Sequence, residues 1–157
     1  MLHLIPAPVH RALYRLAHGL RCIYWRACKP RFDGCRIVAL DGQGRVLLIR
    51  HSYGSGEWMP PSGGIPKGED AVATAVRELR EETGCDLEGA VKLAVLEERL
   101  HGATNMVHVI AGRAIGAPRP DNREVVEAAF FPPDALPDRM PQAVRLQLPG
   151  FVRALPG

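Results

Sequence analysis

The stretch from Gly63 to Cys85 reads GGIPKGEDAVATAVRELREETGC, and the interpretation of the whole chain starts from it. Its first half is rich in glycine and proline, so we expect a loop whose backbone can approach a ligand closely. Its second half predicts a helix over residues 70–83, and Gly84 suits the end of that helix. Three carboxylates stand at i, i+3 and i+4 and so share one helix face: Glu78, Glu81 and Glu82.

An acidic helix face of this kind has two interpretations. Like charges clustered on one helix repel each other, and a divalent cation offsets that repulsion and prefers hard oxygen ligands. Phosphate oxygens of a substrate would then complete the coordination. A solvated acidic face is the alternative, and it is the common one for glutamate-rich helices. The three glutamates alone therefore do not decide the function.

The spacing of the whole segment resembles the Nudix hydrolases, which carry the pattern G-x5-E-x7-R-E-U-x-E-E-x-G-U, where U is a bulky aliphatic residue. The matching residues are Gly63, Glu69, Arg77, Glu78, Leu79, Glu81, Glu82 and Gly84. Cys85 departs from the last aliphatic position, but a buried cysteine packs as a small hydrophobe. Upstream, residues 58–64 (WMPPSGG) resemble the family's W-x-L-P-G-G-G, with Pro60 and Ser62 as departures.

This resemblance implies an α+β fold, an α/β/α sandwich in which a mixed sheet lies between helices. It also implies hydrolysis of a nucleoside diphosphate linked to another group, X, with Mg²⁺ as cofactor and Mn²⁺ as a substitute. By position, the metal ligands would be Glu78, Glu81, Glu82 and the carbonyl of Gly63. Arg77 would belong to the catalytic group, and Glu69 would lie outside the ligand set and pair with Arg77.

The general base differs among members of the family. It is a glutamate of the motif or one from a later loop, and Glu124 and Glu127 stand in the right region for the latter. Their alternative role is that of surface residues beside a strand. Trp58 either stacks on a substrate base or packs in the core. His101 and His108 either contact phosphate or lie on the surface, and we favour the surface.

The motif defines the bond that is cut and leaves X open. Shortly after the motif, some subfamilies carry a proline or a tyrosine, but residues 100–103 here read Leu-His-Gly-Ala. The signatures of ADP-ribose and dinucleoside polyphosphate hydrolases are thus both absent. Two alternatives to a nucleotide pyrophosphohydrolase remain: a non-catalytic Nudix-fold domain that binds nucleotides or regulates, and an isomerase of prenyl diphosphates.

The rest of the chain mixes strands and helices without regular alternation, which independently favours an α+β fold. Apolar and alternating segments predict strands over residues 35–40, 45–50, 91–100, 106–115 and 125–131. Pro141 is suited to begin a short helix through residue 148, which Pro149 and Gly150 would end.

The N-terminal part predicts an amphipathic helix over residues 7–28, so we divide the chain into an arm, 1–31, and a Nudix hydrolase domain, 32–157. The arm holds six Lys/Arg and no Asp/Glu. Its apolar stripe needs a partner: Val9, Leu13, Leu16, Leu20, Ile23 and Ala27. We favour packing on its own domain or on a second subunit in a homodimer. An anionic membrane surface and RNA phosphates are the further alternatives.

Composition suits one domain, since 157 residues with 46% apolar and 24% charged residues are typical of a globular protein. No apolar run approaches the roughly 18 residues that span a bilayer, and we see no signal peptide. The four cysteines show no zinc-binding spacing, so we expect free thiols in a reducing compartment and a cytoplasmic location.

Overall fold

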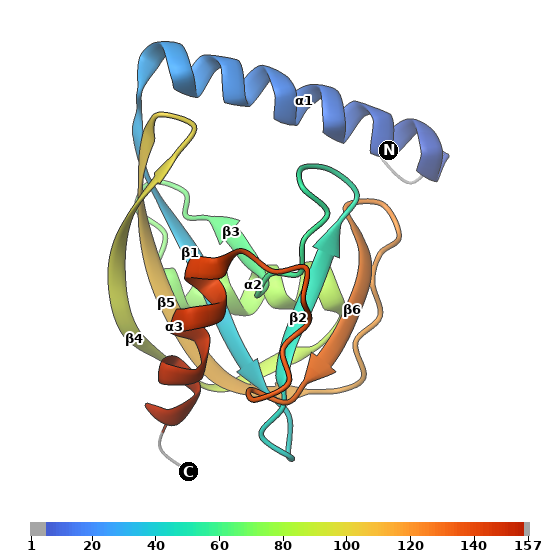
Figure 1. Ribbon diagram of the computed structural model, residues 1–157, viewed down its shortest axis with the longest axis vertical. Helices are drawn as coiled ribbons and strands as arrows, with labels where there is room; N and C mark the ends of the chain where they lie inside the picture. The colour runs from blue at the N-terminus through green and yellow to red at the C-terminus, as the bar shows by residue number, and fades with distance from the viewer. Residues whose placement is uncertain (1–5, 156–157) are drawn as a thin grey trace.

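A computed structural model describes residues 6–155, without the side chain of Ala7. One mixed sheet lies between two helices, and a third helix crosses one end of it (Figure 1). The strands are β1 (Arg31–Leu40), β2 (Val46–His51), β3 (Ser62–Gly64), β4 (Asp86–Leu100), β5 (Ala103–Ile115) and β6 (Val125–Phe131). The helices are α1 (Ala7–Cys28), α2 (Ala71–Thr83) and α3 (Gln142–Arg153). The predicted α+β fold is confirmed.

The sheet has the order β4-β5-β1-β2-β6, and β3 also pairs with β1. The pairing of β1 with β5 is parallel along all of β1, while the other pairs are antiparallel. In the pairing of β3 with β1, Gly63 lies opposite Cys35. The glycine-rich segment, predicted as a loop, is thus partly a short strand that belongs to the sheet.

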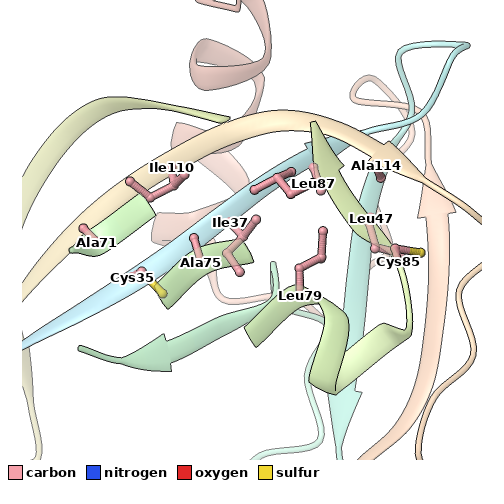
Figure 2. Close-up of a cluster of buried hydrophobic side chains, with 11 residues drawn as sticks. Cys35, Ile37, Leu47, Ala71, Ala75, Leu79, Cys85, Leu87, Ile110 and Ala114 are labelled. Carbon is pink, nitrogen blue, oxygen red and sulfur yellow. The ribbon is translucent and has the colours of Figure 1, made fainter. Parts of the chain in front are cut away.

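Two hydrophobic cores lie on the two faces of the sheet. On one face, Ala75 and Leu79 of α2 pack against Ile37 and its neighbours (Figure 2). Cys85 is fully buried in this core, which explains how the chain accommodates the departure from the family pattern at this position. On the other face, Val144 and Leu148 of α3 pack against residues of β1, β2 and β5. Burial of α2 in the first of these cores fixes the helix that carries the acidic motif.

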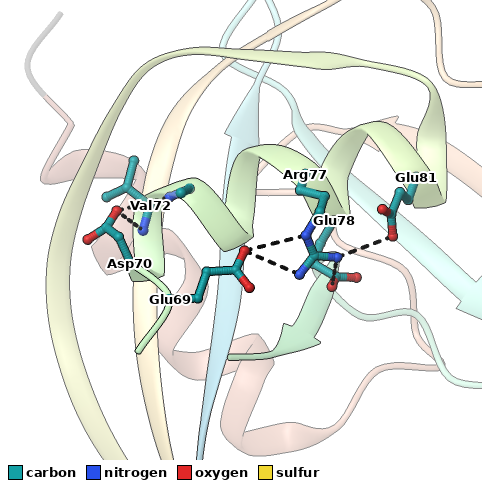
Figure 3. Close-up of polar contacts among 7 residues, drawn as sticks. Glu69, Asp70, Val72, Arg77, Glu78 and Glu81 are labelled. Carbon is teal, nitrogen blue, oxygen red and sulfur yellow. Dashed lines mark hydrogen bonds and ion pairs between the residues drawn. The ribbon is translucent and has the colours of Figure 1, made fainter. Parts of the chain in front are cut away.

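Local sequence explains both ends of α2. The Asp70 side chain accepts hydrogen bonds from the backbone N–H groups of Val72 and Ala73, each at 3.0 Å (Figure 3), as an N-cap does. At the other end, Gly84 adopts φ 72°, the left-handed conformation that ends many helices. The predicted helix over residues 70–83 is confirmed to within one residue.

The predicted end of the C-terminal helix is wrong, because α3 continues through Pro149 to Arg153. Leu148 is fully buried, and Phe151 and Val152 beyond the proline pack on the same core. A proline inside a helix costs about 3 kcal/mol, whereas burying one large apolar side chain gains about 1.5–3 kcal/mol. Packing on both sides of Pro149 therefore offsets the lost hydrogen bond.

The N-terminal helix forms where predicted, but the face that contacts the domain differs. Its apolar stripe is exposed, with Leu16, Leu20 and Ile23 at 62%, 58% and 63%. Packing of this stripe on its own domain is therefore wrong. Contacts come from the opposite side of α1, where Trp25 stacks on Phe32 of β1 with 4.8 Å between ring centroids. The second-subunit, membrane and RNA alternatives stay predictions.

Polar contacts hold the other half of α1 over the ends of the strands (Figure 1). Arg11 donates two hydrogen bonds to the carbonyl of Asn122, at 2.8 and 3.1 Å, and Arg15 donates one to the carbonyl of Ser52 at 3.1 Å. Both arginines therefore donate hydrogen bonds to backbone carbonyl groups of the domain. Among the described residues, no helix is both long and apolar enough to cross a membrane.

Candidate active site

The inward face of α2 presents two of the motif glutamates to β3. The Glu78 side chain is 18% exposed and that of Glu82 is 7% exposed. A Cβ on Gly63 would overlap the Glu78 carboxyl group, so any larger residue at this strand position would displace that carboxylate. The backbone N–H of Ser62 donates a hydrogen bond to Glu82 Oε2 at 3.2 Å. The pair of β3 and α2 thus forms a cradle for two carboxylates.

Glu81 lies on a different side of the helix from this buried pair. Its side chain is 60% exposed and accepts a hydrogen bond from Arg77 at 3.4 Å. The same guanidinium donates to Glu78 at 2.7 Å and to Glu69 at 3.4 and 3.5 Å (Figure 3). The structure therefore brings all four of these motif residues together, with Arg77 at the centre. Glu81 occupies the solvent side of the group.

A third carboxylate, that of Glu124, comes from the loop before β6. The Asp121 side chain accepts hydrogen bonds from the backbone N–H groups of Arg123, Glu124 and Val125, which winds this loop into a tight turn. Glu124 accepts a hydrogen bond from the Tyr53 hydroxyl at 2.8 Å. Its charge contributes to raising the pKa of both Glu78 and Glu82, so it faces the same space.

Electrostatics of this cluster favour protonated carboxyls when no cation is present. Burial, followed by the charge of Glu124, raises the pKa of Glu82 well above its usual range. Burial also raises the pKa of Glu78, although the Arg77 guanidinium acts against it. Glu78 lies against the Gly63 backbone and Glu82 follows one helical turn later, and carboxylate oxygens are the hard donors that suit a divalent ion. The residues present fit such an ion.

The sequence analysis did not identify two residues that lie near the carboxylate cluster. His51 ends β2, where a register shift between Arg50 and His51 redirects the chain, and its Nε2 lies 3.9 Å from Glu82 Oε1. Burial lowers the pKa of His51, so the ring is neutral at neutral pH and this contact is not a charge pair. Asp121 is the other, and the Asp-Asn pair at 121–122 carries the turn signal that would have identified it.

The remaining sequence candidates lie away from the carboxylates. Glu127 pairs with Arg50 at 2.8 Å, and the Arg50 guanidinium lies over the Trp58 ring, 5.7 Å from its centroid. Trp58 also packs edge-on against Phe131 and belongs to the second core. His108 contacts Asp33 at 3.0 Å. His101 lies in the β4–β5 turn, next to α1.

A cavity of about 420 Å³ adjoins the carboxylate cluster. Its lining includes His51 and Tyr53, which contact Glu82 and Glu124 respectively. α1 contributes His18 to the same cavity. A larger cavity of about 660 Å³ is lined by Glu69 and Asp70 as well as by basic residues such as Lys67. Neither cavity is lined by Glu82 or Glu124 themselves, and the smaller one adjoins them through His51 and Tyr53.

Comparison with known proteins identifies this arrangement. Residues 30–153 match the family model described as the NUDIX domain. The chain belongs to the Nudix family. Hydrolases of this family act on phosphoanhydride bonds and typically use a divalent metal ion. The family prediction from the motif is thus confirmed, while the exact division of the chain after residue 31 stays a prediction.

Individual Nudix relatives differ in what they act on. An RNA pyrophosphohydrolase from Teredinibacter turnerae is 43% identical over 69 residues, covering 41% of this chain and 40% of that protein. An asymmetrical bis(5′-nucleosyl)-tetraphosphatase from Mus musculus is 36% identical over 75 residues, covering 48% and 44%. The aligned region is less than half the length of either relative.

The fold itself is matched over almost all of a solved structure. The MutT NUDIX hydrolase from Burkholderia pseudomallei superposes with a TM-score of 0.66 at 29% identity, covering 75% of this chain and 95% of that one. The Nudix fold expected from the motif is therefore confirmed.

Proposed function

We propose that this protein is a Mg²⁺-dependent pyrophosphohydrolase that cuts a phosphoanhydride bond in a nucleoside diphosphate derivative. The observation that carries this proposal is the buried carboxyl group of Glu82, with the half-buried Glu78 and Glu124 near it and a cavity of about 420 Å³ beside them. A structural acidic surface would leave these side chains in solvent. A domain that binds nucleotides without cutting them would have no need of two acids, Glu78 and Glu82, held at raised pKa.

The ion would be held by Glu78, Glu82 and the Gly63 carbonyl, with Glu81 as a further ligand from the solvent side and Mn²⁺ as a substitute for Mg²⁺. Bound there, it would neutralise phosphate charge and lower the pKa of a water molecule. Arg77, held by Glu69, keeps Glu78 in place through the 2.7 Å hydrogen bond. This support is why we include Arg77 and Glu69 in the working site.

Glu124 is the residue that we propose as the additional base or ligand. Its carboxylate faces Glu82 and is oriented by the Tyr53 hydroxyl at 2.8 Å. As a base, it would accept the proton of the attacking water while the other carboxylates stay in place. Glu127 was the equal candidate in the sequence, but it pairs with Arg50. We therefore assign no catalytic role to Glu127, and substrate binding by Trp58 stays a prediction.

The test compares two variants that differ by three positions in the chain. We expect Glu124→Gln to lower kcat by roughly 10²–10⁴-fold, the usual contribution of a general acid or base. Glu127→Gln is the matched control, because it removes the same charge from the same strand region, and it should keep kcat within about threefold. Rates are measured with Mg²⁺ by release of phosphate, pyrophosphate and nucleoside monophosphate.

The substrate panel should contain RNA with a 5′ polyphosphate end, a bis(5′-nucleosyl) tetraphosphate, nucleoside triphosphates and nucleotide sugars. The first two follow from the names of the relatives, and the class shared by all four is a phosphoanhydride joined to a nucleoside. Absence of turnover on the whole panel, together with equal behaviour of the wild type and Glu82→Gln, would support the binding-domain alternative. Turnover of a prenyl diphosphate without release of phosphate would support the isomerase.

Location and assembly belong to the same proposal. All four cysteines are free, which suits a reducing compartment such as the cytoplasm. The exposed apolar stripe of α1 suits a homodimer contact, with a membrane surface or RNA as alternatives. Light scattering, liposome sedimentation and RNA binding, each with and without substitution of Leu16 and Leu20 by serine, distinguish these three partners.

A further inference from the structure

Three side chains that are typical ligands of transition metals meet where α1 crosses the β4–β5 turn. They are His18, Cys22 and His101, and their ligand atoms all lie within 4.8 Å of one another. His18 and Cys22 stand at i and i+4 on α1, so both project toward the turn. His101 comes from a part of the chain far away in sequence. The cluster therefore exists because of the docking of α1 on the domain.

One distance within this cluster, that between Cys22 and His18, agrees with a shared metal ion. Zinc lies about 2.3 Å from cysteine sulfur and about 2.0 Å from histidine nitrogen, and tetrahedral angles then separate the two ligand atoms by about 3.5 Å. Cys22 Sγ and His18 Nε2 lie 3.6 Å apart, in a side-chain hydrogen bond whose length is close to this separation. His101 is exposed, so a small rotation of its side chain can complete the site. A tetrahedral ion with three protein ligands keeps a fourth position for water.

The local structure around His101 and His18 defines how the cluster is held. His101 adopts φ 51° and Gly102 φ 91°, so the two form a tight hairpin turn in which asparagine and glycine are the favoured residues. Few residues other than glycine adopt this conformation, and histidine is enriched among those that do. On the α1 side, Nε2 is the His18 ring nitrogen that faces Cys22, while Nδ1 is buried on the other side of the ring.

We propose that His18, Cys22 and His101 bind a zinc ion that fastens α1 to the β4–β5 turn. The site is separate from the carboxylate cluster and differs from it in chemistry. Thiolate and imidazole select zinc, cobalt or copper over Mg²⁺, whereas the glutamates select hard ions. Zinc would also hold His18 in the wall of the cavity of about 420 Å³. Sequence spacing does not reveal the site, because Cys22 is its single cysteine.

Cobalt is the probe, because Co²⁺ occupies zinc sites and gives a thiolate-to-metal absorption band that carboxylate sites lack. The full-length protein is reduced, freed of metal with a chelator and titrated with Co²⁺ in excess Mg²⁺, which occupies the carboxylates. We expect one equivalent of Co²⁺ to produce the band, and Zn²⁺ to abolish it by displacement. Glu82→Gln should behave as the wild type, since the band does not depend on the catalytic cluster.

Substitutions identify the ligands. Cys22→Ser should abolish the band, whereas Cys28→Ser is the matched control and should keep it, because Cys28 is an exposed cysteine of the same helix outside the cluster. His101→Ala should weaken Co²⁺ binding by at least about tenfold. Zn²⁺ should also slow backbone hydrogen exchange in residues 7–28 of the wild type and of Cys28→Ser, but not of Cys22→Ser.

The proposal is overturned if the wild type gives no thiolate band, or if the band survives in Cys22→Ser. It is equally overturned if Zn²⁺ leaves hydrogen exchange in α1 unchanged. Should Cys22→Ser fail to fold, His101→Ala decides, because this exposed turn residue can lose its ring with little effect on the fold. Unweakened Co²⁺ binding by that variant would exclude His101 and with it the link between α1 and the turn.

Discussion

At the scale of single residues, Glu82 combines a requirement of function with a cost to stability. Its carboxyl group is buried beside Glu124 and its pKa is raised well above the usual range, first by burial and then by that charge. Near neutral pH, the fold without a cation therefore holds a carboxyl whose charge it disfavours. Active-site groups commonly trade stability for function in this way.

We expect Glu82→Gln to raise the Tm of chelator-treated protein at pH 8 by roughly 2–5 °C, on the order of 1 kcal/mol, while abolishing turnover. The amide keeps the shape and still accepts the Ser62 N–H. The folded-state pKa of Glu82 exceeds its unfolded value of about 4.3. The protonated carboxyl therefore contributes its full stability below the unfolded pKa, and this contribution is lost as the pH rises through the folded-state pKa. The gain from glutamine should thus grow from near zero at pH 4 toward pH 8.

Two controls separate this explanation from a general effect of the substitution. Glu81→Gln removes a charge from the same helix at a site that is 60% exposed, so its Tm should stay within about 1 °C of the wild type. Saturating Mg²⁺ should shrink the difference between Glu82→Gln and the wild type, since the ion offsets the charge. Differential scanning calorimetry over this pH range measures both, and a Glu82→Gln variant less stable than the wild type at pH 8 would contradict the account.

The sequence alone predicted most residues of the site, but it did not show which of the two later glutamates joins them. Glu78, Glu82, Arg77 and Gly63 follow from one local motif, because a helix and the segment before it bring them together. Glu124 and Glu127 could not be told apart, since only the Asp121 turn and the pairing of β6 with β2 send one toward Glu82 and the other toward Arg50.

At the scale of secondary structure, helices were predictable where their signals are local. The N-cap at Asp70 and the glycine after residue 83 define α2 without reference to the rest of the fold. The helical period of α1 was equally clear, but it did not reveal which face meets the domain. That choice depends on Phe32, Tyr53 and His101, which come from three separate segments. The length of α3 likewise depends on a core that lies elsewhere in sequence.

The docking of α1 leads to a prediction that reverses the usual expectation for an amphipathic helix. Trp25→Ala should weaken the docking by about 1 kcal/mol, because it removes the stack on Phe32. Leu20→Ala is the control on the apolar stripe. It should change the free energy of α1 docking by less than about 0.5 kcal/mol in the monomer, since Leu20 is 58% exposed. Hydrogen exchange in residues 7–28, measured at low protein concentration without lipid, reports the docking. A larger effect of Leu20→Ala would show that the stripe is the docking face.

At the scale of the whole molecule, parts from distant segments enclose one space beside the carboxylates. The cavity of about 420 Å³ is lined by His18 from α1, His51 at the end of β2, Tyr53 just after it, and His101 from the β4–β5 turn. The family match begins at residue 30, so α1 lies outside it. The catalytic glutamates thus belong to the shared domain, whereas part of the wall that a substrate would meet belongs to the N-terminal helix.

This division predicts that α1 affects substrate binding more than chemistry. A chain of residues 30–157 keeps Glu78, Glu82 and Glu124 but loses His18 and the rest of the helix, so the cavity opens on one side. For the best substrate of the panel, we expect KM to rise by roughly tenfold, the equivalent of about 1.4 kcal/mol of lost binding, and kcat to stay within about threefold. Circular dichroism must first show that the shortened chain is folded. A loss of kcat at unchanged KM would mean that α1 acts on the carboxylate cluster, because a wall that only binds the substrate contributes equally to the ground state and the transition state.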